Sequence, residues 1–299
     1  MLHGFDPLAS RFLADLERIH DKVIRAERQI SSGLRVETAS DDPQAVMEIL
    51  RVKTRVDMNT QVQTNLGRVQ TQVDSAESAM RQAVAIMERA RVLGAQNSGT
   101  TAVNRQGMAA EAEQLHARLL ALVSTSSEGR FVFGSDDLQA PPYVADSTQP
   151  NGVRLVAASR VNSNVVVDEN QTSFAVSRTA SELFDASGSE NAFQALTDLR
   201  TALANDSGDD VSAAMPKITA ALDLINRELA FYGAAQNRVK DAFDAARKNA
   251  VALKTDLSRL QEADLPTAIL ALNSAGLHQQ TALSAHSKVP KASLFDYLG

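Results

Sequence analysis

Residues 218–260 read ITAALDLINRELAFYGAAQNRVKDAFDAARKNAVALKTDLSRL, and this stretch decides the fold. Its apolar residues recur at alternating intervals of four and three, with a single polar exception: Ile218, Leu222, Ile225, Leu229, Tyr232, Gln236, Val239, Phe243, Ala246, Ala250, Leu253, Leu257 and Leu260. A heptad pattern of this kind predicts an α-helix that packs lengthwise against another helix. A helix over 216–262 therefore needs an equally long partner.

Residues 43–97 supply that partner. Their apolar residues repeat with the same spacing, at Val62, Leu66, Val69, Val73, Ala76, Met80, Ala83, Met87 and Ala90. Asp41 or Asp42 can cap the helix, and Pro43 suits its first position. The helix would be roughly 80 Å long at 1.5 Å per residue, a length typical of a coiled coil. The two halves of the chain are thus expected to pair as a rod.

Three shorter helical patterns surround this rod. The first runs from Phe5 to Ile30, the second covers about 105–125, and the third follows Pro266. Their seams alternate in the same way, which predicts amphipathic helices at both ends of the chain. Acidic loops are expected at 185–190 and 205–212.

The period changes to that of strands in mid-chain. The runs VRLVAA (153–158), NVVVD (164–168) and SFAVS (173–177) are short and β-branched, and turn-forming residues bound them, which predicts a small antiparallel sheet. The predicted fold class is mainly α with a small β insert, on a coiled-coil rod built from N- and C-terminal segments. We expect terminal helical segments at 1–42 and 263–299, a rod at 43–129 and 186–262, and a projecting β domain at 130–185.

Composition argues against catalysis. The 299 residues include no Cys, which excludes disulfides, thiol nucleophiles and Cys-based zinc sites. The five histidines lack metal-binding spacing, and the Asp pairs at 41–42, 136–137 and 209–210 lie where turns and helix caps favour Asp. We therefore predict no enzyme, no catalytic residue, no metal and no cofactor.

The net charge of −6 gives no bulk attraction to nucleic acid or to anionic membranes. No apolar run is long enough to insert into a membrane, and the N-terminus does not read as a Sec signal peptide. Neither nucleic-acid binding nor membrane insertion is expected.

The two ends carry apolar seams without a globular core beside them. Apolar surface of this kind is unfavourable in water unless a partner covers it. The ends are therefore expected to order fully on assembly with other copies. The residues predicted to serve packing and assembly are Phe5, Phe12, Leu16, Ile19, Val23, Ile30, Leu253, Leu257, Leu260, Leu272, Leu283, Leu294 and Phe295.

Two internal motifs and the C-terminal end carry a resemblance to a known family. ISSGLRV (30–36) followed by ASDDP (39–43) resembles the N-terminal signature of the bacterial flagellin superfamily, and Pro43 resembles its hook-associated protein 3 branch, the hook–filament junction proteins. GRFVFG (129–134) before Pro142 and Tyr143 resembles the step from helical body to β domain in that branch, and SLFDYL (293–298) resembles its end. The motif residues are Ser32, Gly33, Asp41, Asp42, Pro43, Gly129, Arg130, Phe131, Phe133 and Gly134.

The resemblance implies an extracellular structural protein of the bacterial flagellum, exported unfolded by the flagellar type III apparatus. It would self-associate in a ring between hook and filament, with terminal helices in the inner tube and the β domain outward. Its implied partners are the hook-side junction protein, flagellin or the second junction protein, and an export chaperone that holds residues within 250–299. Two alternatives stay open: a flagellin, the filament subunit itself, and a coiled-coil adaptor or signalling protein.

Overall fold

The computed structural model describes residues 7–99, 104–134, 140–156, 164–166 and 173–287. The chain divides into two compact units, residues 1–57 with 250–299 and residues 58–249. Two long helices, α2 (Pro43–Asn97) and α6 (Gly208–Gln261), contribute to both. The division into terminal segments, rod and β domain made from the sequence remains a prediction.

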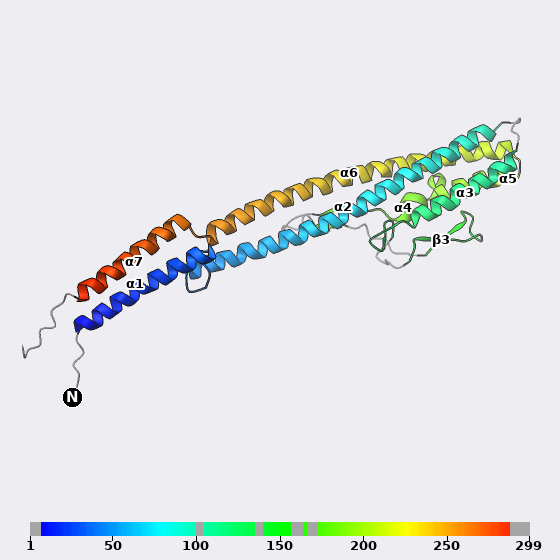
Figure 1. Ribbon diagram of the computed structural model, residues 1–299. Coiled ribbons are helices and arrows are strands. Elements are labelled where there is room, and N and C mark those ends of the chain that lie inside the picture. Colours follow the sequence, from blue (N-terminus) through cyan, green and yellow to red (C-terminus); the bar gives the residue numbers. More distant parts are fainter. Residues whose placement is uncertain (1–6, 100–103, 135–139, 157–163, 167–172, 288–299) are drawn as a thin grey trace, which may run out of the picture. The chain divides into compact units, whose positions relative to one another are not determined.

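In the second unit, α2 and α6 lie side by side (Figure 1). The predicted seams are buried there: Met80, Met87, Ile225 and Val239 have no exposed surface. Gln236, the polar exception, donates its side-chain amide to the Asp74 carboxylate at 2.9 Å across the pair. The predicted lengthwise pairing of the two halves is therefore confirmed for these segments.

The start of α6 differs from the sequence prediction. Residues 208–212, expected in an acidic loop, form its first turn. The Ser207 hydroxyl accepts the Asp210 N–H at 3.2 Å and so caps the helix, while Asp209 and Asp210 place negative charge at the favourable end of its dipole. The interior Pro216 removes one backbone hydrogen bond, and the buried side chains of Val211, Ala214 and Ile218 hold these turns in the core.

Shorter helices pack against this pair. The predicted third helix is α3 (Arg105–Val123), followed by α4 (Ala180–Phe184) and α5 (Ala192–Ala204), with a 3-10 turn at Gly188–Glu190. No element was predicted at α5, although its apolar residues recur at helical intervals, at Phe193, Leu196, Leu199 and Leu203. It lies against α3, and its apolar side chains are buried.

The strands pair as antiparallel ribbons rather than as one sheet. Described residues form three two-stranded ribbons: β1 (Ser126–Ser127) with β2 (Arg130–Phe131), β3 (Tyr143–Ala145) with β4 (Val153–Leu155), and β5 (Asn164–Val166) with β6 (Ser173–Ala175). The antiparallel pairing was predicted. Within the described residues the three ribbons share no strand, so they do not form one sheet.

Aromatic side chains join the ribbons to the helices. Phe133 packs edge-on against Phe184 and against Tyr232 of α6, with centroids 5.6 and 6.3 Å apart. Tyr143 of β3 packs on Phe193 of α5 at 5.4 Å. The described part of the insert is thus built into the same core as the rod helices.

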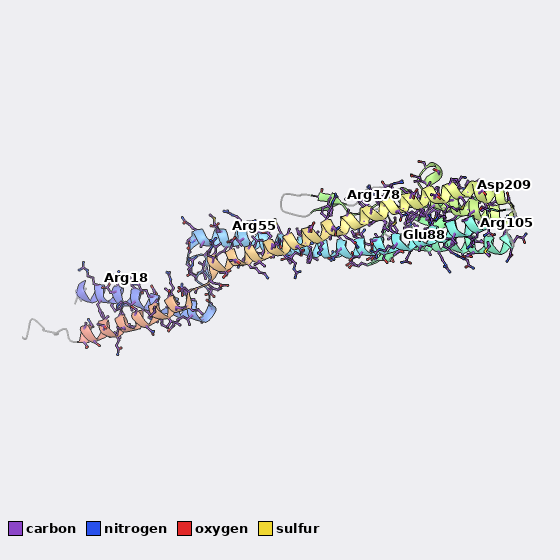
Figure 2. The ribbon with its side chains drawn as sticks, turned by 90° about the horizontal axis from the view of Figure 1, so that it is seen from above. Arg18, Arg55, Glu88, Arg105, Arg178 and Asp209 are labelled. Atoms are coloured by element: carbon purple, nitrogen blue, oxygen red, sulfur yellow. The ribbon has the colours of Figure 1, made fainter. Side chains whose placement is uncertain are left out.

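Arg105 closes one end of the second unit (Figure 2). Its side chain is only 7% exposed and forms an ion pair with Asp206 at 2.8 Å. Its Nε donates to the Asn97 carbonyl at 3.0 Å and its Nη2 to the Gly99 carbonyl. One guanidinium therefore ties the end of α2 to the turn before α6.

In the first unit, α1 (Pro7–Ser32) lies beside α7 (Leu265–Ser287) (Figure 1). The Phe12 and His286 rings stack with centroids 4.0 Å apart. Among the described residues of this unit, buried apolar side chains are few, and aromatic ones are absent from them: Ala26, Val36, Ile49, Val52, Leu253, Ala268 and Ala275.

Candidate functional site

The most distinctive surface belongs to α7. Between Asp264 and Lys288 the sequence contains no Asp, Glu, Lys or Arg. Ala268 and Ala275 are buried, yet several large apolar side chains stay in water: Leu265 is 43% exposed, Ile269 47%, Leu270 70%, Leu277 63% and Leu283 50%. Large apolar side chains that gather on an exposed helix normally mark a surface that a partner covers. No described helix of the chain has the length and hydropathy of a membrane span.

The surface of α1 has the opposite character. Its outward residues include charged side chains such as Arg18, which forms an ion pair with Asp15 (Figure 2). Among the described residues of α1, only Leu13 and Ile24 are large exposed apolar residues. The hairpin therefore pairs α1, which has charged side chains on its surface, with α7, which contains no Asp, Glu, Lys or Arg.

The predicted assembly residues differ in burial. Phe12, Leu16, Ile19, Val23 and Ile30 of α1 are half-buried, as are Leu257, Leu260 and Leu272, and Leu253 is buried. Leu283 alone is mostly exposed. Phe5, Leu294 and Phe295 lie outside the described residues. A role of this set in assembly remains a prediction.

Sequence reasoning missed the most exposed apolar residues. These are Leu13, Met47, Leu50, Val251, Leu270 and Leu277. The heptad search favours residues that face a partner within the chain, whereas these lie off the seam. The charge-free run of α7 was the available signal.

Two linkers meet at the base of the hairpin. Gly33, with φ at 71°, ends α1 in the left-handed region that favours glycine. The Ala263 N–H donates to the Gly33 carbonyl at 2.9 Å, and the Arg35 N–H donates to the Gln261 carbonyl at 2.7 Å. The Ser32 hydroxyl donates back to the Arg28 carbonyl at 2.8 Å, one turn earlier in α1.

The two aspartates before Pro43 have separate tasks. Asp42 caps α2 by accepting the Ala45 N–H at 3.0 Å. That bond, and the nearby Arg35 guanidinium, hold the pKa of Asp42 below its ordinary value. Asp41 closes the preceding turn by accepting the N–H groups of Thr38 and Glu37, and these bonds lower its pKa. Pro43 is the first residue of α2, where its missing N–H is harmless.

The second motif makes a tight turn and an anchor. Glu128 and Gly129, with φ at 50° and 77°, connect β1 to β2. Arg130 is exposed, Phe131 is half-buried, and Phe133 enters the core at 1% exposure. A side chain at Gly134 would meet Phe131 at 2.9 Å, so this close approach requires glycine.

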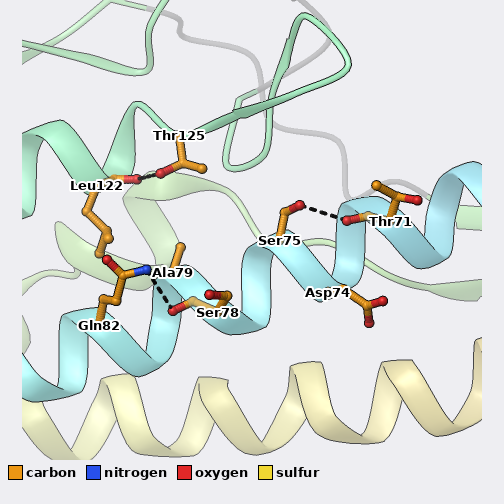
Figure 3. A pocket seen from close by; sticks show the side chains of 8 residues that line it. All are labelled: Thr71, Asp74, Ser75, Ser78, Ala79, Gln82, Leu122 and Thr125. Atoms are coloured by element: carbon orange, nitrogen blue, oxygen red, sulfur yellow. Dashed lines mark hydrogen bonds between the residues drawn. The ribbon is translucent and has the colours of Figure 1, made fainter.

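An open pocket of about 480 Å³ lies on α2 beside the end of α3 (Figure 3). It is lined by Thr71, Asp74, Ser75, Ser78, Ala79, Gln82, Leu122 and Thr125. The hydroxyls of Ser75 and Thr71 donate to carbonyls one turn earlier in α2, and Asp74 accepts from Gln236. The lining therefore groups no acid with a base. Across the described residues, no three metal-ligating side chains are placed to hold an ion.

Comparisons with known proteins point to one family. Residues 8–136 match the bacterial flagellin N-terminal helical region, and residues 215–298 match the bacterial flagellin C-terminal helical region. Curated proteins give no match.

Solved structures share the fold at low sequence identity. A Vibrio parahaemolyticus protein assigned as a flagellar hook-associated protein is 17% identical, with a TM-score of 0.65, over 74% of this chain and 100% of that one. Hook-associated protein 3 of Legionella pneumophila is 13% identical, with a TM-score of 0.63, over 71% and 98%. FlgL of Bacillus cereus is 18% identical, with a TM-score of 0.56, over 71% and 99%.

Proposed function

The chain belongs to the flagellin superfamily, and we propose that it is a structural subunit joining hook to filament in the bacterial flagellum. The observation that carries an assembly role is α7, a charge-free helix whose leucines lie in water. The junction position is supported by Asp41–Asp42–Pro43 and by the fold shared with hook-associated proteins. Family membership argues against the adaptor alternative.

The energetics favour contacts with several neighbours. Full burial of a large apolar side chain contributes about 1.5–3 kcal/mol, so covering the exposed fractions of the five large α7 residues would contribute about 4–8 kcal/mol per copy. Joining two proteins costs about 4–15 kcal/mol in lost freedom. A single α7 contact is thus marginal, whereas a ring or tube, in which each copy meets several others, is stable.

The second unit supplies the rigid part of the subunit. Its core contains the large, fully buried side chains of the α2–α6 pair and of the ribbons packed against them. A helical body of this kind transmits load without rearrangement because close-packed interiors resist deformation. In this proposal the chain has no catalytic role and acts as a mechanical part of the flagellum.

Partners and route follow from the same proposal. The ring would contact the hook-side junction protein on one face and flagellin or the second junction protein on the other. Export would use the flagellar type III route, and a chaperone would shield residues within 250–299, where α7 is exposed. Deleting residues 280–299 should then weaken chaperone affinity, and unchanged affinity would contradict this contact.

Electron microscopy of labelled flagella tests the position. An epitope inserted after Ser147, an exposed residue in the turn of the β3–β4 ribbon, should be decorated by gold-labelled antibody at the hook–filament junction. Label along the whole filament would support the flagellin alternative. A protein without the insertion controls for nonspecific decoration, and absence of label from detached flagella would contradict the proposal.

A further inference from the structure

The two linkers of the first unit form a short antiparallel pair. One joins α1 to α2 and the other joins α6 to α7. Leu34 lies opposite Glu262, and the backbone bonds Arg35 N–H to Gln261 and Ala263 N–H to Gly33 flank this pair on either side. The Leu34–Glu262 pair itself exchanges no backbone bonds, which is the geometry with the closest side chains across an antiparallel pair.

The Arg35 side chain spans both linkers. Its Nη2 donates to the Leu260 carbonyl at 2.8 Å, and its Nη1 lies 3.3 Å from the Asp42 carboxylate. Leu260 is in the last turn of α6, where carbonyls lack partners within the helix. Asp42 caps the start of α2. One guanidinium therefore bonds the end of one long helix and the beginning of the other.

We infer that Arg35 is a positioning residue that locks the two linkers into one clasp, so that α1 and α7 move together as a hairpin. The planar fork of arginine can serve two acceptors in fixed directions, which the single ammonium of lysine cannot reproduce. The link from Glu262 to α7 is also short, since α7 begins at Leu265, so a paired Glu262 leaves α7 little independent reach. The relevance to assembly rests on the proposed function, whereas the clasp itself is a property of the single chain.

An engineered disulfide tests the pairing. Because the chain has no cysteine, Leu34→Cys with Glu262→Cys introduces the only two thiols. A pair with closely spaced side chains fits disulfide geometry, so we expect a bond within the monomer under mild oxidation, seen by mass spectrometry after tryptic digestion. Leu34→Cys with Ala271→Cys is the matched control and should stay reduced. Bonds between chains, or equal oxidation of both pairs, would overturn the inference.

Substitutions of Arg35 test its role. In Arg35→Gln, hydrogen exchange of the amides at 35 and 263 should accelerate roughly 3- to 10-fold, the range expected for one lost charged hydrogen bond in a partly exposed site. Arg35→Lys should restore part of the protection because it can serve one acceptor. Arg11→Gln, a change at an exposed arginine near the other end of α1, is the control and should leave both amides unchanged.

A distance measurement tests the coupling of the helices. Spin labels on Ala14→Cys and Ser284→Cys, exposed residues of α1 and α7, should give a narrow distance distribution that broadens in Arg35→Gln and partly narrows again in Arg35→Lys. An unchanged distribution together with unchanged exchange at 263 would refute the clasp. These measurements use the isolated full chain, so they fail or succeed independently of where gold labels the flagellum.

Discussion

Leu270 offers the sharpest test of the α7 surface. It is 70% exposed, so Leu270→Ser should change the free energy of unfolding by less than about 0.5 kcal/mol. In an assembly that covers this side chain, the same change removes about 1–2 kcal/mol per copy, obtained by scaling the burial of a leucine by its exposed fraction. Because a loss of about 1.4 kcal/mol weakens an association constant tenfold, the concentration needed for assembly should rise about 5- to 30-fold.

Adding Leu277→Ser strengthens the test. This residue is 63% exposed, and the double variant should lose about 2–4 kcal/mol per copy. The assay is the amount of protein incorporated into sheared flagella, alongside sedimentation of the purified chain over a concentration series. Leu155→Ser, at an exposed leucine of the second unit, is the matched control. If the double variant folds and incorporates like the control, α7 does not carry the contact.

Four other outcomes are expected. Leu253→Ala, at a buried position, should reduce the free energy of unfolding by about 2–4 kcal/mol, and Leu260→Ala, at a half-buried one, by less; equal losses in denaturant titrations would contradict the packing. Tyr232→Phe should cost about 1–2 kcal/mol because its hydroxyl accepts a backbone N–H at 3.1 Å, and a neutral result would mean that this bond is dispensable. Gly129→Ala should cost about 1 kcal/mol by thermal unfolding, since its φ is 77°; no change would argue against the left-handed turn. The pKa of Asp42 is lowered chiefly by the backbone N–H that its side chain accepts. Its contribution to stability is therefore complete above the ordinary Asp pKa of about 3.9 and is lost as pH falls through the lower pKa of the folded chain. Acid titration should erase the difference in stability between the parent chain and Asp42→Ala, and a difference that persists in acid would refute this.

The long helices were predictable because burial repeats along them many times. Successive turns of α2 place residues such as Met80 and Met87 in the core, and this repeat is clear from Val62 to Ala90. The start of α6 was harder, because Pro216 and the acidic residues before it also suit a loop. The outcome depends on the cap made by Ser207 and on the burial of Val211 and Ala214, which the folded chain supplies.

The site was predictable in chemistry and less so in detail. The terminal helices were expected to expose apolar surface, yet Phe12 and Leu16 are half-buried and lie in the helix beside α7. A seam pattern states which face of a helix seeks a partner and cannot state whether that partner is in the same chain. Arg35 carried no periodic signal at all, because its two acceptors lie seven and 225 residues away in sequence.

The second unit determines the stability of the single chain, whereas the first unit carries the surface proposed for association. In the second unit, large side chains such as Tyr232 and Phe193 are already withdrawn from water in the single chain, so their substitution changes unfolding. In the first unit, Leu270 and Leu277 keep most of their surface in water, so in the proposed assembly their substitution would change the equilibrium between free and assembled copies. A subunit built in this way can fold its second unit before it meets its neighbours and still expose apolar surface that they can cover. In the proposed assembly α7 would have to be uncharged, because one ionised side chain buried without a partner would cost more than a leucine contributes.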